Sequence, residues 1–210
     1  MAISDEGSVD RAAVVRRGLL LNYATIGYNS LEAIASLIAG VLAGSVSLLG
    51  FGVDSLIEVA SSGVAQWRLR SDLNEAGRER IEQTTHIVIG WSFLALAVYI
   101  VTDSTYSLWL RDQPRRSWFG MGVLALSVIV MPALARAKRN VALSMASGAL
   151  VADATQTSLC AYLSGIALGG VALNVLLGWW WADPVAALVM VPIIAREAAE
   201  GIRGGQRCHD

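Results

Sequence analysis

Two carboxylates lie four residues apart in a strongly apolar stretch of the chain. Asp54 and Glu58 belong to the sequence LLGFGVDSLIEVASSG, residues 48–63. On a helix, side chains four residues apart project from one face, so the two acids would be neighbours. Because like charges repel, a buried acid pair holds a proton or binds a cation. A divalent cation that bridges both carboxylates satisfies both charges, so cation binding is the chemistry that this pair favours.

A second group of side chains with ligand atoms follows in the stretch LVADATQTSLCAY. Gln156 and Cys160 come three and seven residues after Asp153, and these intervals place all three on one face of a helix. They offer an amide oxygen, a thiolate and a carboxylate. A cysteine in an apolar segment is also a common small buried hydrophobe, so both interpretations of Cys160 stay open.

A third polar stripe occurs in the stretch NYATIGYNSLEA. Asn22, Asn29 and Glu32 again follow helical spacing, and Asn29 with Glu32 forms a secondary polar seam. The asparagines could instead form hydrogen bonds between helices, and Glu32 could pair with a polar group of a neighbouring helix. We expect the three polar stripes to converge on one hydrophilic region inside the protein.

Another acid stands at the start of an apolar segment. Asp183 precedes Pro184 in the sequence WADP. An aspartate followed by a proline in the first turn is a common helix start. We therefore expect Asp183 to cap its own helix rather than to bind an ion.

The elements that carry these residues are apolar helices. The chain has 210 residues, 55% hydrophobic and 16% charged, with a mean hydropathy of +0.54. A soluble domain has about 25% charged residues, so the composition indicates a polytopic membrane protein. The apolar runs lack the two-residue alternation of barrel strands, and each is near the ~20 residues that cross the hydrocarbon core. The expected fold class is an all-α membrane protein with six transmembrane helices at 19–42, 46–67, 86–109, 118–135, 141–169 and 182–202.

The basic residues predict the orientation of these helices. With both termini cytoplasmic, most arginines and lysines fall on the cytoplasmic side, as the positive-inside rule requires. The sequence RAKRN, which contains Lys138, is then a cytoplasmic loop between the fourth and fifth helices. The expected domains are a cytoplasmic arm over 1–12, the six-helix transmembrane domain over 13–203, and a short cytoplasmic tail over 204–210 without a C-terminal cytoplasmic domain.

Several classes of function are disfavoured by the same sequence. The formal net charge of −1 gives no reason to expect a nucleic-acid partner. Two distant cysteines, Cys160 and Cys208, do not make a disulfide framework. The chain has no Ser/His/Asp or His-Glu-x-x-His arrangement, so we do not expect an enzyme.

Three stretches resemble the transmembrane domain of the cation diffusion facilitator (cation efflux) family. GSVSLLGFGVDSLIEVASS resembles its second helix, where an Asp-x-x-x-Asp pair binds zinc. LVADATQTSLCAYLS resembles its fifth helix, and LGWWWADPVAALVMVPIIAREA its sixth. Their order and spacing match the six-helix domain over residues 13–203. In its brevity and its second-helix acids, the chain is similar to the transmembrane protein 163 branch, which is linked to zinc efflux.

The resemblance implies a metal site that departs from the family pattern. The second-helix pair of the family falls on Asp54 and Glu58, and its usual fifth-helix pair, His-x-x-x-Asp, falls on Gln156 and Cys160. Asp153 lies one turn before Gln156 on the same face. The implied midplane ligands are therefore Asp54, Glu58, Asp153 and Gln156, with Cys160 as an optional ligand. Mixed oxygen and sulfur donors suit zinc, while carboxylates also accept manganese or iron.

The resemblance also implies a mechanism and partners. No prosthetic group is expected, and zinc or another divalent cation is the transported ion. Because bound metal requires deprotonated ligands, metal and protons would move in opposite directions. Export would occur across the lipid bilayer of a bacterial inner membrane or plasma membrane, by a homodimer. Gly40 and Gly44 offer a small-residue face for contacts between copies or, equally, for packing within one chain.

Two other functions are compatible with the same residues. A non-transporting membrane regulator or metal sensor would keep the fold, and the altered fifth-helix pair favours that interpretation. A carrier of organic cations would need aromatic side chains along the acidic region, where only Tyr23, Tyr28 and Tyr162 occur. That scarcity disfavours the organic-cation carrier.

Overall fold

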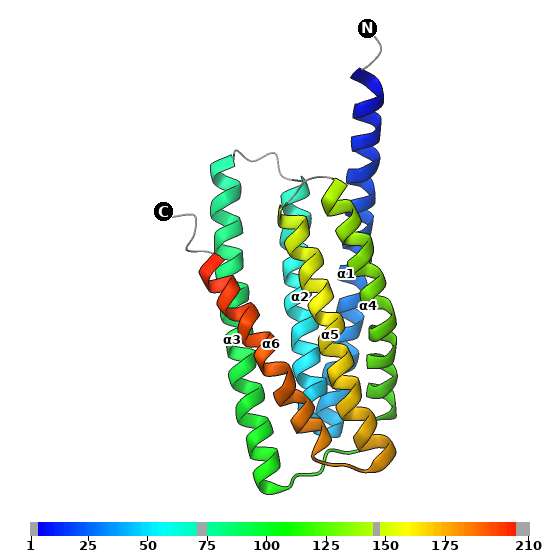
Figure 1. The fold of residues 1–210 in the computed structure, drawn as a ribbon, viewed down its shortest axis with the longest axis vertical. Helices are drawn as coiled ribbons and strands as arrows, with labels where there is room; N and C mark the ends of the chain where they lie inside the picture. The colour runs from blue at the N-terminus through cyan, green and yellow to red at the C-terminus, as the bar shows by residue number, and fades with distance from the viewer. Residues whose placement is uncertain (1–3, 71–74, 145–147, 205–210) are drawn as a thin grey trace.

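The computed structural model describes residues 4–70, 75–144 and 148–204, and these ranges form a bundle of long helices (Figure 1). The helices are α1 (Ser4–Ala43), α2 (Val46–Arg70), α3 (Glu75–Leu110), α4 (Trp118–Ser144), α5 (Gly148–Leu177) and α6 (Ala182–Gly204). The prediction of an all-helical protein is confirmed. Residues 4–12 of the predicted arm continue α1 as a helix.

Five of the six helices are long and apolar enough to cross a membrane. Their apolar segments are Arg16–Ala43, Val46–Val64, Ile87–Leu110, Trp118–Ser144 and Asp153–Leu177, in α1 to α5. The described part of α6 does not meet the same criterion, because its second half carries charged side chains: Arg196, Glu197, Glu200 and Arg203. The protein is thus a multi-pass membrane protein, whereas the sixth span and the cytoplasmic position of both termini stay predictions.

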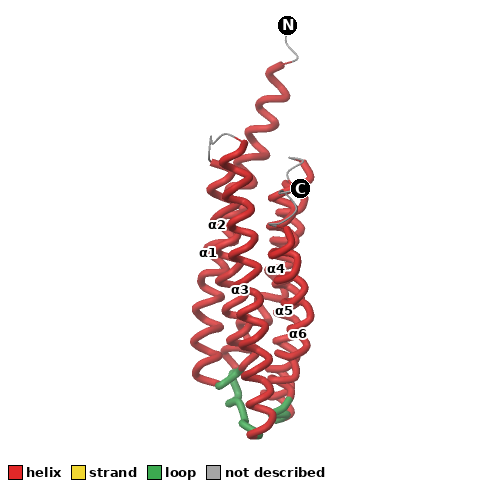
Figure 2. The backbone as a smooth tube through the Cα atoms, turned by 90° about the vertical axis from the view of Figure 1, so that its left-hand side faces the viewer, coloured by secondary structure: helices red, strands yellow, loops and turns green. Residues whose placement is uncertain are grey.

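The helices divide into two groups. α3 packs mainly against α6, while α1 packs on α2 and α4, and α5 packs on α4, α2 and α6. Figure 1 shows the α3–α6 pair on one side of α2 and α5, and Figure 2 shows that all six helices run along one long axis. The polar stripes predicted on the first, second and fifth helices therefore belong to one group of four, α1, α2, α4 and α5.

Glycines bring α1 and α2 into close contact. A Cβ added to Gly40 would lie 2.8 Å from Cγ of Leu49, and one added to Gly52 would lie 2.9 Å from Cγ of Leu37. Side chains cannot approach so closely without a shift of the neighbouring helix. Of the two uses predicted for the small residues, Gly40 serves packing within the chain. Gly44 has a φ of 65°, and it forms the turn between α1 and α2, where glycine adopts the left-handed conformation without strain.

The predicted boundary between the fourth and fifth helices is wrong. α4 does not end near residue 135 but continues to Ser144, and α5 begins at Gly148 rather than at residue 141. The basic character of the sequence RAKRN predicts a loop, yet alanine, arginine and lysine are strong helix formers. As a result, Lys138 is part of α4 and is only 5% exposed.

Asp183 caps a different helix from the one predicted. Its Oδ2 accepts a hydrogen bond from the Val46 backbone N–H at 2.9 Å, and its Oδ1 accepts one from the Ser45 hydroxyl at 2.7 Å and another from the Ser47 hydroxyl. These donors stand at the start of α2, whose first N–H groups have no partner within the helix. Asp183 therefore joins the start of α6 to the start of α2.

Candidate metal centre

Asp54 and Glu58 lie inside the bundle on the face of α2 that packs against α5. Asp54 is 4% exposed and Glu58 is 1% exposed. One oxygen of each acid, Asp54 Oδ2 and Glu58 Oε2, has no hydrogen-bond partner among the described residues. Burying a carboxylate without a partner is costly. These two oxygens are therefore available to a cation or a proton.

Cys160 of α5 lies next to the same two acids. It is a free cysteine with 1% exposure, and its thiol interacts electrostatically with Asp54, Glu58 and Glu32. The face of α5 that was predicted to carry ligands thus meets the acid pair of α2. We call Asp54, Glu58, Cys160 and Glu32 the acidic seam.

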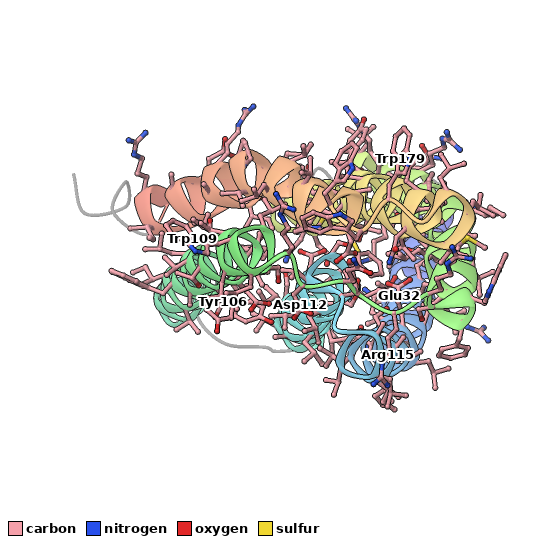
Figure 3. All side chains as sticks on the ribbon, turned by 90° about the horizontal axis from the view of Figure 1, so that it is seen from below. Glu32, Tyr106, Trp109, Asp112, Arg115 and Trp179 are labelled. Atoms are coloured by element: carbon pink, nitrogen blue, oxygen red, sulfur yellow. The ribbon has the colours of Figure 1, made fainter. Side chains whose placement is uncertain are left out.

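Glu32 brings the secondary polar seam of α1 to the acidic seam. Its Oε2 accepts a hydrogen bond of 3.0 Å from the Ser55 hydroxyl, while its Oε1 has no partner in the described structure. The Asn29 side chain is completely buried, and neither its amide nitrogen nor its amide oxygen has a described partner. Figure 3 shows Glu32 among the helices, in contrast to Trp109 and Trp179 near the outside of the bundle.

Asp153 lies on α5 toward the end of the bundle at which α6 ends, and it has a different set of partners. Its Oδ2 forms an ion pair of 2.9 Å with Lys138 Nζ, and its Oδ1 accepts a hydrogen bond of 3.0 Å from the Ser62 hydroxyl. Lys138 Nζ also donates to Ser62 Oγ at 3.3 Å and to Thr157 Oγ1 at 3.0 Å. We call Lys138, Asp153, Ser62 and Thr157 the lysine network.

The lysine network and the acidic seam are connected through one hydroxyl. Thr157 Oγ1 donates a hydrogen bond of 2.6 Å to Glu58 Oε1. Asn22, the first residue of the α1 stripe, donates from Nδ2 to the Ser62 carbonyl oxygen at 3.2 Å. This bond agrees with the interpretation of Asn22 as a hydrogen-bond partner between helices. Gln156 is half-buried, and its Nε2 has no partner among the described residues.

Lys138 was missed as a site residue because its charge suggested a loop. Its spacing contained a usable signal. The buried residues of α4 include Leu124, Ser127, Met131 and Ala135, and Lys138 continues these intervals of three and four residues. Continuing the apolar stripe of α4 past residue 135 would have placed the lysine inside the bundle.

The site is not a preformed coordination sphere. In the ranges that the structure describes, no three His, Cys, Asp or Glu side chains stand together as a metal-binding group. The arrangement instead provides two carboxylates with open oxygens and a thiol, and beside them a carboxylate already neutralised by an ammonium. Such a region can attract a cation electrostatically, and binding it would require the side chains to close around it.

Comparison with known sequences gives two matches. The sequence model of the cation efflux transmembrane domain matches residues 23–204. Transmembrane protein 163 of Xenopus laevis is 28% identical over 138 residues, which are 66% of this chain and 49% of that protein. The chain therefore spans about half the length of the curated relative that it matches.

Proposed function

The chain belongs to the cation efflux family, and from this premise we propose that it exports zinc in exchange for protons through a site between α2 and α5. Members of this family transport divalent cations and are not enzymes. Zinc, the exchange for protons and the site itself are our proposals.

The observation that carries the proposal is the pair of open carboxylates in the acidic seam. An ionisable residue at the centre of a membrane span costs about 3 kcal/mol on insertion scales and usually marks a path for ions or protons. Asp54 and Glu58 are both buried, and each keeps an oxygen without a described partner. A bound divalent cation would offset the repulsion between the two acids.

The proposed ligands are Asp54, Glu58 and Cys160, with Gln156 as a fourth donor. Two carboxylates, a thiolate and an amide oxygen could surround a tetrahedral ion, and sulfur favours zinc over harder cations. Asp153 joins this set only if it leaves Lys138, with which it forms the ion pair described above. Manganese and iron are the alternative cations, because carboxylates accept both.

Exchange for protons follows from the chemistry of these ligands. A thiol and a carboxylate must lose their protons before they bind a metal ion. Acidification of the side that the site faces therefore releases the metal, and metal binding releases protons. Uptake of zinc into vesicles should rise when the interior is more acidic than the exterior.

We propose that the site is exposed alternately to the two sides of the membrane by a relative movement of the two groups of helices. The α3–α6 pair would move against α1, α2, α4 and α5, so that the site opens to one side of the membrane at a time. We further propose six spans with cytoplasmic termini, a homodimer, and a location in a bacterial inner membrane or plasma membrane. The use of Gly40 inside the chain means that another surface must supply the contact between copies.

A regulator or metal sensor is the second candidate, and one observation favours it. No preformed metal-binding group occurs in the described residues, and Asp153 is already neutralised by Lys138. A regulator would retain the fold without carrying a cation across the membrane.

Transport in proteoliposomes separates the two candidates. We expect zinc uptake that depends on an imposed proton gradient and that falls by about 10- to 100-fold or more in Asp54→Asn, because even outer partners of a metal contribute that much. Asp103→Asn is the matched control: this acid of α3 accepts a hydrogen bond only from Tyr99 among its described partners. Absence of uptake of zinc, manganese and iron by well-folded protein would favour the regulator.

A further inference from the structure

A lysine amine lies buried beside the acidic seam with all of its donors used. Lys138 Nζ contacts Asp153 Oδ2, Thr157 Oγ1 and Ser62 Oγ at 2.9, 3.0 and 3.3 Å. An ammonium has three N–H donors, and these three contacts satisfy them. Lys138 is 5% exposed and Asp153 is 4% exposed. The ammonium is therefore a fixed part of the bundle interior and not a surface charge.

The ammonium also orders the groups around it. Ser62 Oγ accepts from Lys138 and donates to Asp153 Oδ1, and Thr157 Oγ1 accepts from Lys138 and donates to Glu58 Oε1. Because an ammonium only donates, each hydroxyl must direct its proton to another acceptor. The result leaves Glu58 Oε1 engaged and Glu58 Oε2 open, while both oxygens of Asp153 are occupied.

We propose that Lys138 is a counter-ion that pairs with Asp153 and keeps this carboxylate from binding the metal. The ion pair thereby lowers the affinity of the acidic seam for a divalent cation. The inference rests on the proposed function, because it concerns the same site. Lys138 acts as a positioning residue: it does not touch the metal but sets the charge and the hydrogen bonds of groups that do.

The physical reason is the balance of charge around the cation. Asp54, Glu58, Glu32 and Asp153 carry negative charge when ionised, and Lys138 offsets the charge of Asp153, with which it forms the ion pair. Without the ammonium, Asp153 is free to join the ligands, and the attraction between site and cation increases. A transporter needs a site that binds firmly enough to load and weakly enough to release. Lys138 thus favours release.

A double-mutant cycle tests the proposal in the full-length protein. The variants are Lys138→Met, Asp153→Asn and the two combined, with Lys138→Arg to restore the charge. Arg139→Met is the matched control, because Arg139 is the exposed neighbour of Lys138 on α4 and carries the same charge. For each variant, zinc affinity and stoichiometry are measured by equilibrium titration, and KM and kcat are measured by transport. The combined variant guards against misfolding, since removal of both members of a buried pair is often neutral for stability.

We expect Lys138→Met to bind zinc about 10- to 100-fold more tightly, with a lower KM and a lower kcat. Arg139→Met should match the wild type, and Lys138→Arg should return affinity toward it. The combined variant should bind zinc close to wild-type affinity, because neither member of the pair is a ligand in the wild type. If instead Asp153 is a ligand in the wild type, the combined variant lacks a ligand and binds zinc well below wild-type affinity, and the proposal is overturned.

The outcome also distinguishes this inference from the proposed function. If wild type binds and transports zinc but Lys138→Met binds no more tightly, the counter-ion role fails and the exporter stands. If wild type binds no divalent cation while Lys138→Met does, transport fails and the role of Lys138 is supported. Absence of binding in both proteins, each shown to be folded, overturns both.

Discussion

Asp183 at the start of α6 and Asp54 in the middle of α2 are buried to a similar degree, with exposures of 1% and 4%. Asp183 accepts hydrogen bonds from two hydroxyls and one backbone N–H. Asp54 has an oxygen without a partner in the described structure, and so does its neighbour Glu58. Burial alone therefore does not identify a site. A carboxylate with a complete set of donors serves the fold, whereas one with an open oxygen is available to a ligand.

The largest effect is expected where the open carboxylates are neutralised. Glu58→Gln keeps an oxygen that can accept from Thr157 but removes the charge, so zinc transport should fall by about 100-fold or more. Its thermal stability in detergent should be equal to or higher than that of the wild type, because a neutral amide is easier to bury. A marked loss of stability in Glu58→Gln would mean that Glu58, like Asp183, stabilises the fold, and it would contradict the contrast between the two acids.

A smaller and opposite effect is expected at Asp183. Asp183→Ala leaves the start of α2 without its acceptor, and the free energy of unfolding should fall by about 2 kcal/mol. Transport per folded molecule should change little. Denaturant unfolding in micelles gives the stability, and transport normalised to folded protein gives the activity. If Asp183→Ala instead has normal stability but does not transport zinc, Asp183 acts in transport and not in stabilising the fold.

The smallest effect is expected at the thiol. Cys160→Ser retains a ligand atom but replaces soft sulfur with hard oxygen, which should lower the preference for zinc over manganese by about tenfold, or about 1.4 kcal/mol. Competition between the two metals for purified protein measures that ratio. An unchanged ratio would mean that Cys160 only packs against its neighbours, and the acid pair would then define the site alone.

Hydropathy predicted most of the helices, because a helix that crosses the hydrocarbon core must be about 20 residues long and mostly apolar. It failed at the end of α4, where the basic sequence RAKRN indicated a loop but contains strong helix formers. It also could not assign Asp183 to α2. A cap that joins residues 183 and 46 is a contact between distant parts of the chain, and local spacing contains no signal for it.

The candidate site was predictable in part for a related reason. Helical spacing placed Asp54 and Glu58 together inside the bundle, because both lie on one helix and are buried. The ion pair between Asp153 and Lys138 joins α5 to α4, and it depends on how those helices pack. The sequence therefore indicated which acids are inside the membrane, but only the structure distinguishes an acid with a cationic partner from acids with open oxygens.

The hydrogen bonds between Asp183 and the start of α2 also restrain how α6 can move. These hydrogen bonds hold one end of α6 to the start of α2, whereas no ion pair among the described residues joins the other end of α6 to another helix. We therefore expect any tilt of α6 to be centred on the end that Asp183 holds. A helix of 23 residues is about 35 Å long, so a tilt of about 10° about this end moves its far end by about 6 Å. Movement of the α3–α6 pair would then be greatest at the end where α6 carries its charged residues, and least beside Asp183.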